Sequence, residues 1–364
     1  MAENDHAILV GISRYADPSL RQLDGPVHDV RLMERWLLQP SGGGLPRDNV
    51  TAIVSDESPG ASFANETMPP LFQDFLDAFM KLVRTSDRSG YIRREGSRLY
   101  LYFAGHGFCE KYNRDAHAAL YVANADRTLN WNIYGTYFAQ WVKDQGLFGE
   151  IVLIMDCCRD AELARMPLTP PLSRATDVGA GQDVRLFELY AAPRGGKAQE
   201  RRIAARNNEV HGLLTHAFFD AFHHAAPGQT SVSTQAIKHY LEQRWQDICG
   251  DEPSDPPEVI LPSNGEIVFE RGAANDLIQR FRLIELAAGD IFEVLDGKFA
   301  AIATVTLVAG MAQVERPNGH AETVAIQDGV LTLPLPSGLY MAMSSRPGET
   351  IRRTFQAGGP DVEL

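Results

Sequence analysis

Cysteine, basic charge and long apolar runs are all scarce in this chain. There are only four cysteines, too few for a disulfide scaffold, and the adjacent pair Cys157 and Cys158 is unsuited to bridging itself. The four do not form a four-ligand zinc pattern. We therefore expect a reduced protein with no metal-ligating residues of this kind.

Positive charge is outweighed by negative charge, and the formal net charge is −13. A nucleic-acid-binding protein usually carries a basic stripe instead. No apolar run approaches the roughly 20 residues of a membrane span, and residues 1–6 do not open a signal peptide. We expect a cytoplasmic protein that binds neither nucleic acid nor a membrane.

What the chain does contain is an ordinary globular composition, with 44% hydrophobic and 22% charged residues. Its 364 residues suffice for one large domain and a smaller one. Apolar runs that predict strands alternate with stretches of helical spacing. The predicted strands are 7–12, 50–54, 99–107, 118–122, 151–158 and 186–192, and the predicted helices begin near 25, 69, 134, 212 and 232. This order predicts an α/β fold, a mainly parallel sheet flanked by helices on both faces.

Two later segments change character. Residues 161–184 are rich in proline and glycine and exceed the usual connection length, which indicates a functional or cleavable loop. From residue 273, after a short helical start, β-type runs follow at 301–308, 329–335 and 338–343, the pattern of a small all-β sandwich. We therefore predict domains at 1–272 and 273–364.

The chemically capable residues stand at the ends of two predicted strands. One strand ends in His106, between Gly105 and Gly107, and the other ends in Asp156, followed by the two adjacent cysteines. The carboxyl edge of an open α/β sheet is where ligands bind. A thiol and an imidazole that meet there can act as a nucleophile and its base.

These motifs resemble those of the caspase and metacaspase peptidases, over roughly residues 6 to 270. The elements follow the family order: a first strand, the helix start 25–29, the two strand ends, and the helix start 212–215. The interval between His106 and Cys158 also agrees with the roughly 50 residues expected for caspase-type sequences. The resemblance implies the caspase-like fold and a Cys-His cysteine endopeptidase.

The resemblance also assigns roles to individual residues. In the metacaspase pattern Asp, any residue, Cys, the nucleophile is Cys158, and Cys157 is interpreted as a small buried hydrophobe on the opposite side of the strand end. His106 is the catalytic base, for which the alternative interpretation is a structural histidine. The backbone N–H groups of Gly107 and Cys158 form the implied oxyanion hole.

Two positions match pocket acids of metacaspases, which cut after arginine or lysine. They are Asp29 and Asp156, whose carboxylates would give a cationic side chain charge-assisted hydrogen bonds. Asp29 can also be interpreted as a helix-start acid, and Asp156 as a strand-end acid that bonds local backbone. Pro26 and Ala104 depart from the metacaspase pattern. Arg159 matches the caspase Cys-Arg pair, which leaves a preference for acidic substrates open.

The sequence thus predicts a bacterial cysteine endopeptidase that acts on protein substrates after Arg or Lys, through His106 and Cys158. Alternatives are a pseudo-protease that binds partners, a hydrolase of a small amide, and a peptidase with Asp specificity. The family implies an upstream activating protease or signalling protein, in a stress, signalling or anti-phage pathway. It also brings in Ca2+ as an activator, although Asp126, Asp156 and Asp160 make no calcium-loop pattern.

Self-processing is a further expectation for an enzyme that cuts after basic residues. Basic residues stand in or beside the predicted loop, at Arg165, Arg174 and Arg185. A solvated loop without processing is the equal alternative. The sequence leaves the oligomeric state open.

Overall fold

The computed structural model describes most of the chain, in two compact units that are treated separately. The units are Met1–Ile203 with Asn208–Gly272, and Ala204–Asn207 with Ala273–Leu364. The described residues are 2–39, 42–55, 68–110, 118–126, 128–162, 167–173, 179–203, 206, 209–226, 229–250, 252–270, 276–296, 301–315, 321–336, 339–346 and 349–364.

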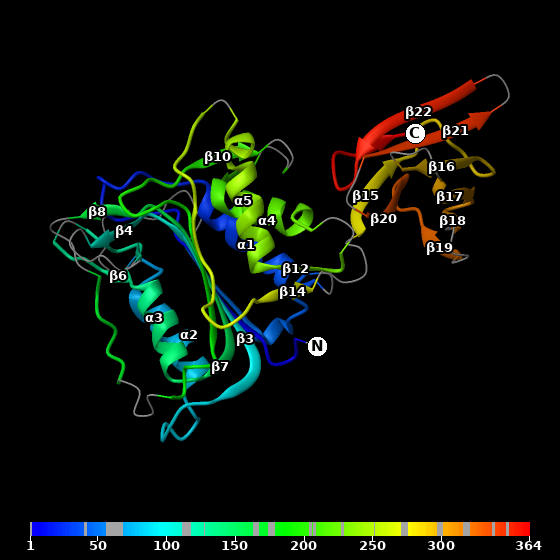
Figure 1. Cartoon of the computed structure of the whole chain (residues 1–364). Coiled ribbons are helices and arrows are strands. Elements are labelled where there is room, and N and C mark those ends of the chain that lie inside the picture. The colour runs from blue at the N-terminus through cyan, green and yellow to red at the C-terminus, as the bar shows by residue number, and fades with distance from the viewer. Residues whose placement is uncertain are drawn as a thin grey trace. The chain divides into compact units, whose positions relative to one another are not determined.

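A six-stranded sheet forms the centre of the first unit (Figure 1), in the order β13-β9-β7-β3-β1-β2. Its strands are β1 (His6–Gly11), β2 (Val50–Val54), β3 (Arg94–Gly105), β7 (Phe148–Cys157), β9 (Arg185–Tyr190) and β13 (Glu258–Ile260). Neighbours pair in parallel, except that β13 runs antiparallel to β9. The predicted α/β class with a mainly parallel sheet is confirmed.

Helices cover both faces of this sheet. One face carries α1 (Gly25–Leu38), α4 (Leu213–His224) and α5 (Thr234–Cys249), and the other carries α2 (Phe72–Val83) and α3 (Gly135–Asp144) (Figure 1). A three-residue 3-10 helix, η1 (Arg47–Asn49), precedes β2. Trp36 of α1 packs edge-on against Phe218 and Phe222 of α4. The helices arise where the sequence has apolar residues at helical spacing, because only such a stripe can cover a sheet.

Strand β3 shows how the sheet separates two cores. Leu101 and Phe103 lie in the core beneath α2 and α3, whereas Tyr100 and Tyr102 lie in the core beneath α1, α4 and α5. Successive side chains of a strand point to opposite faces. A strand segment covered on both faces must therefore be apolar at nearly every position, as β3 is from residue 99 to residue 104.

Short strands extend the two strands that carry the candidate site. Strand β4 (Gly107–Glu110) follows His106, and β8 (Asp160–Glu162) follows Arg159. They pair in parallel, with Phe108 opposite Asp160, so the segments around His106 and Cys158 are held side by side. The other short strands of the unit are β5 (Ala119–Tyr121), β6 (Asn132–Ile133), β10 (Glu200–Ile203), β11 (Glu209–Gly212), β12 (Ser231–Ser233) and β14 (Val268–Glu270).

Two sheets that share one apolar core make up the second unit. Their strands are β15 (Asp276–Arg282), β16 (Ile291–Leu295), β17 (Ala301–Val308), β18 (Met311–Glu315), β19 (Ala321–Ala325), β20 (Val330–Pro336), β21 (Leu339–Arg346), β22 (Glu349–Gln356) and β23 (Val362–Glu363). The predicted short helical start is wrong, because β15 pairs with β20 along its whole length. Pairing with a distant strand overrides a local helical pattern.

The predicted loop 161–184 is described only in part. Within it, the Ser173 carbonyl accepts a hydrogen bond of 2.7 Å from the Trp141 indole of α3, and the Leu168 N–H donates to Asn132. Residues 167–173 are therefore hydrogen-bonded to Asn132 at one end and to α3 at the other. Arg165 and Arg174 lie outside the described residues. Arg185 begins β9 and pairs with Glu150 at 2.5 Å, so the predicted processing after it would fall at the start of a sheet strand.

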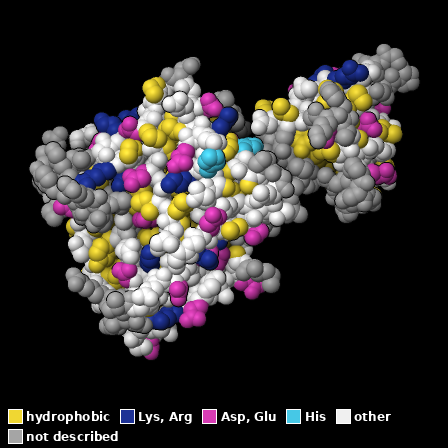
Figure 2. All heavy atoms as spheres, in the orientation of Figure 1, with side chains coloured by type: hydrophobic (Ala, Val, Ile, Leu, Met, Phe, Trp, Pro, Cys, Tyr) yellow, Lys and Arg dark blue, Asp and Glu magenta, His cyan; other side chains and the backbone are white. Residues whose placement is uncertain are grey.

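Charge on the surface of the first unit is mixed. On the face shown in Figure 2, acidic and basic side chains are interspersed over this unit. Within the described residues, no helix is long and apolar enough to cross a membrane.

Candidate active site

His106 and Cys158 lie next to each other at the carboxyl edge of the central sheet. The parallel register of β3 and β7 pairs Gly105 with Cys157, and one step further brings the two candidates together. Both line one pocket, whose empty volume, including its open mouth, is about 430 Å³. Its lining is completed by Arg21, Leu23, Pro26, Asp29, Ala104, Gly105, Asp156, Ala198, Gln199, Glu200 and Gly212.

His106 is held by one hydrogen bond of its ring and one of its backbone. The ring Nε2 lies 2.7 Å from the Arg21 carbonyl oxygen, and the backbone N–H donates to the Tyr15 hydroxyl at 2.7 Å. A carbonyl only accepts, so Nε2 carries the proton. Burial lowers the pKa of His106, so the ring is neutral at physiological pH. Nδ1 is then the nitrogen that can take a proton.

Of the two adjacent thiols, only Cys158 faces the pocket. Its Sγ lies 3.7 Å from the Ala198 carbonyl oxygen. Cys157 is fully buried in the core beneath α2 and α3, where a Cβ on Gly107 would lie 2.5 Å from its Sγ. Burial raises the pKa of the Cys158 thiol. The pocket therefore holds a thiol and a neutral imidazole, and a nucleophilic role for the sulfur would require transfer of its proton to a base.

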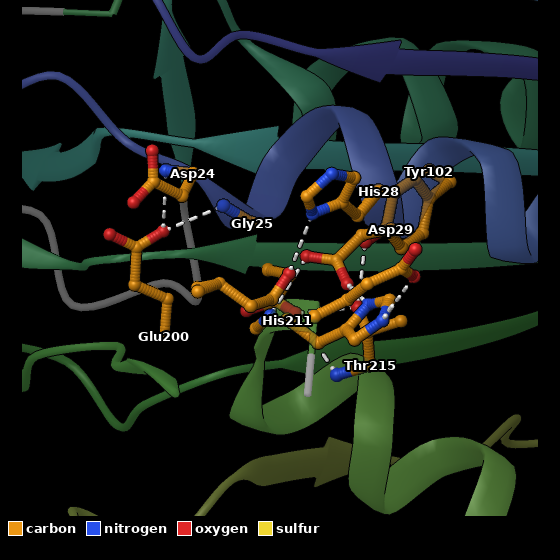
Figure 3. A network of polar contacts seen from close by, with 12 residues as sticks. Asp24, Gly25, His28, Asp29, Tyr102, Glu200, His211 and Thr215 are labelled. Atoms are coloured by element: carbon orange, nitrogen blue, oxygen red, sulfur yellow. Dashed lines mark hydrogen bonds and ion pairs between the residues drawn. The ribbon is translucent and has the colours of Figure 1, made fainter. Parts of the chain in front are cut away.

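The segment that leads into α4 binds both of the predicted pocket acids. Asp29 accepts from the Gly212 N–H at 2.9 Å and lies 2.7 Å from His211 Nδ1 (Figure 3). Asp156 accepts from the Thr215 N–H at 3.0 Å and from its hydroxyl at 2.6 Å. Asp29 is not in the first turn of α1, so its position does not fit the helix-start interpretation.

Burial of Asp156 and its proximity to Asp29 change its ionisation. Desolvation first, and the Asp29 charge second, raise the pKa of Asp156 to about 7. The hydrogen bonds from Thr215 oppose this shift. A cation in the pocket would favour the ionised form of Asp156, because an opposite charge lowers the pKa of a carboxyl group.

Sequence reasoning missed three residues that build this site: Glu200, Arg21 and Tyr15. Glu200 lines the pocket, while Arg21 and Tyr15 hold His106. Glu200 stands between Gln199 and Arg201 in a polar stretch that carries no motif. Arg21 binds His106 through its backbone carbonyl, a group that every residue has, so the sequence could not single it out.

Other sequence candidates lie elsewhere. The Arg159 side chain is 1% exposed; its guanidinium lies 4.4 Å from the centre of the Tyr190 ring and bonds to Glu258. Gly107 is buried at the start of β4, and its oxyanion role with Cys158 stays a prediction. Among the described side chains, no three His, Cys, Asp or Glu residues are grouped to hold a metal ion. Asp126, Asp156 and Asp160 therefore form no such cluster.

Comparison with known proteins identifies the family. Residues 4–360 match the caspase-domain model of peptidase family C14. The chain therefore belongs to the caspase-domain family.

The individual relatives are more distant. A probable protease of a Desulfuromonadales bacterium is 32% identical over 104 residues, which are 28% of this chain and only 12% of that protein. Caspase-1 from Spodoptera frugiperda is 12% identical, with a TM-score of 0.42 over 72% of this chain and 87% of that one. A structure of pro-sf-caspase-1 has the same identity and a TM-score of 0.39, over 71% and 91%.

Proposed function

We propose that this protein is a cysteine endopeptidase that hydrolyses protein substrates after arginine or lysine. The observation that carries the proposal is the composition of one pocket. A half-buried thiol, a neutral imidazole and three carboxylates line it together, from Cys158, His106, Asp29, Asp156 and Glu200.

The chemistry follows from the state of the resting pair. His106 Nδ1 takes the proton of Cys158 as sulfur attacks the peptide carbonyl, and then gives it to the leaving amine. Water hydrolyses the resulting thioester by the same base, which releases the second product and restores the thiol. The backbone N–H groups of Gly107 and Cys158 are the proposed donors to the oxyanion.

The basic specificity rests on the charges around the pocket. Three acidic side chains and one basic side chain, Arg21, line the pocket, and the 71% exposed Arg21 pairs with Glu200 at 3.3 Å. A substrate guanidinium or ammonium would meet Asp29 and Asp156 as acceptors. For Asp specificity the pocket would need a free cation, and Arg159 does not supply it because its guanidinium is bound elsewhere.

The remaining roles are also predictions. The cytoplasmic location rests on the composition of the sequence. The upstream activating protease or signalling partner, calcium activation, and a stress, signalling or anti-phage role rest on family resemblance.

Fluorogenic peptides that end in Arg, Lys or Asp test the proposal. The full chain should cleave the Arg and Lys peptides, and Cys158→Ala should abolish cleavage while its melting temperature is unchanged. Cys157→Ala is the matched control, because it removes the neighbouring thiol that does not face the pocket; it should retain cleavage. Each protein is assayed with and without calcium.

Each other outcome has a definite meaning. Cleavage after Asp would retain the nucleophile and overturn the basic specificity. Loss of activity in Cys157→Ala but not in Cys158→Ala would reverse the assignment of the thiols. No cleavage by the full chain, with or without calcium, would favour the pseudo-protease.

A further inference from the structure

Glu200 uses its two carboxylate oxygens on the same short segment of chain. Oε2 accepts the backbone N–H groups of Gly25 at 2.8 Å and Asp24 at 3.1 Å (Figure 3). Oε1 lies 3.3 Å from the Arg21 guanidinium. The side chain of Glu200 is only 15% exposed, so a largely buried carboxylate binds the segment 21–25.

Glu200 also provides the acceptor for backbone N–H groups at the start of α1. Asp24 occupies the N-cap position, but its own side chain makes no capping hydrogen bond. Free N–H groups at a helix start need acceptors, and a negative charge there is favoured by the helix dipole. Glu200 supplies both from a hairpin strand far away in the sequence.

The same segment orients the imidazole. The carbonyl of Arg21 is the acceptor for His106 Nε2–H, and this contact leaves Nδ1 free to act as the base. We propose that Glu200 is a positioning residue for His106: it holds residues 21–25 so that the Arg21 carbonyl selects the Nε2–H form of the ring. The inference rests on the proposed function only in taking His106 as the base.

The charged and polar groups around His106 determine how each substitution should change its pKa. Burial lowers the pKa of His106 most, and the hydrogen bond to the Arg21 carbonyl opposes it. The charge of Arg21 lowers this pKa, while Glu200 and Asp160 raise it. Tyr15 contacts the ring and the backbone of His106. Removing Glu200's charge should therefore lower this pKa, and removing Arg21's charge should raise it. These opposite shifts follow from the two charges alone, so the tautomer of His106 is the readout that tests the positioning role.

The variants are Glu200→Gln and Arg21→Met. Gln keeps an oxygen that can accept from Gly25 but loses the charge, and Met keeps the Arg21 carbonyl but loses the guanidinium. Glu34→Gln is the matched control, because Glu34 pairs with the exposed Arg47 at 2.8 Å and is 20% exposed. This pair resembles the Arg21–Glu200 pair in having an exposed arginine and a largely buried glutamate, and Glu34 does not line the pocket.

The measurement is carbon NMR of the imidazole in the full chain. The protein carries Cys158→Ala, and the signal is assigned by its loss in His106→Gln. Glu200→Gln should change His106 from one Nε2–H tautomer to a mixture and shift its titration to lower pH, while Arg21→Met should shift it to higher pH. In chains with an intact Cys158, kcat should fall about tenfold for Glu200→Gln and about threefold for Arg21→Met. Glu34→Gln should change nothing.

Three outcomes would overturn the inference. A single unchanged tautomer in Glu200→Gln, even with a lowered melting temperature, would make Glu200 a helix cap only. A rise in KM with unchanged kcat and tautomer would make it a substrate contact only. If the His106 titration shifted in the same direction in both variants, the opposite effects assigned to the Glu200 and Arg21 charges would be wrong. Because the NMR signal needs no cleavage, failure of the proposed peptidase activity is distinguishable from failure of this inference.

Discussion

The ionised carboxylate of Asp156 is needed for the proposed selectivity, but its burial makes that charge costly for the stability of the folded protein. Its carboxyl group is buried beside Asp29, and its pKa is raised to about 7. The folded protein therefore holds this proton more tightly than the unfolded chain does. Between the ordinary pKa of 3.8 and about 7, the folded state binds more protons, so the free energy of unfolding falls as pH rises.

Replacing this carboxyl group should separate stability from function. Over the whole window the contribution of Asp156 amounts to roughly 4 kcal/mol. Asp156→Asn cannot ionise, so its melting temperature relative to the natural protein should rise from pH 4 to pH 8. Its kcat/KM for Arg peptides should fall about 100-fold, because a charge partner of the substrate cation is lost.

The control is Asp77→Asn, an exposed acid on α2. It should follow the pH dependence of the natural protein and keep its activity. If the melting temperatures of Asp156→Asn and the natural protein differ by the same amount at pH 4 and pH 8, the raised pKa is wrong. If Asp156→Asn cleaved Arg peptides as well as the natural protein does, Asp156 would not contribute to the specificity of the pocket.

At the scale of elements, the turn from β11 into α4 holds both pocket acids. Residues 211–215 provide the hydrogen bonds to Asp29 and to Asp156. This turn needs a glycine, because a Cβ at Gly212 would lie 2.1 Å from a carboxylate oxygen of Asp156. The sequence showed Gly212 and Thr215 only as a family-like helix start.

Gly212→Ala should therefore displace Asp156 and impair the pocket. We expect a loss of about 1–3 kcal/mol in the free energy of unfolding from overpacking, together with at least tenfold lower hydrolysis of Arg peptides. Gly90→Ala is the matched control, because a Cβ at Gly90 meets nothing within 4 Å. Denaturant unfolding and peptide hydrolysis check both variants, and equal behaviour of the two would contradict the close approach at Gly212.

The elements of the first unit were largely predictable, for a physical reason. Strands covered on both faces must be apolar at nearly every position, and covering helices must carry an apolar stripe, so both leave local patterns. β15 was predicted wrongly, as a short helical start, because its partner β20 lies far along the chain. Its strand pairing depends on that contact and not on its own residues.

At the scale of the whole molecule, the two units have separate apolar cores. Leu101 is fully buried in the first unit and Leu333 is fully buried in the second. Proteins built of several compact units commonly unfold in more than one step. Calorimetry of the full chain should show two transitions.

Core substitutions assign these transitions. Leu333→Ala should destabilise the second unit by about 2–5 kcal/mol and lower one transition, while hydrolysis at the lower temperatures is retained. Leu101→Ala, the matched change in β3, should lower the other transition and reduce activity with it. If either change lowers both transitions equally, the units unfold as one.

The sequence by itself determined the order of strands and helices, the two strand ends, and the residue types His106 and Cys158. These signals are local, because burial on one or both faces of an element is written in the spacing of its own apolar residues. The step from those residues to a peptidase came from resemblance to a family, and the caspase-domain membership is now shown.

Tertiary structure alone decided which ring nitrogen of His106 can accept a proton, which backbone groups bind the two buried acids, and what holds the start of α1. Each depends on groups distant in sequence: the Arg21 carbonyl on His106, the α4 turn on Asp29 and Asp156, and Glu200 on the start of α1. The sequence does not reveal which backbone carbonyl accepts a hydrogen bond, because every residue has one. The burial of a charged side chain leaves no characteristic spacing of residues either. Contacts of this kind exist only once the sheet edge has formed.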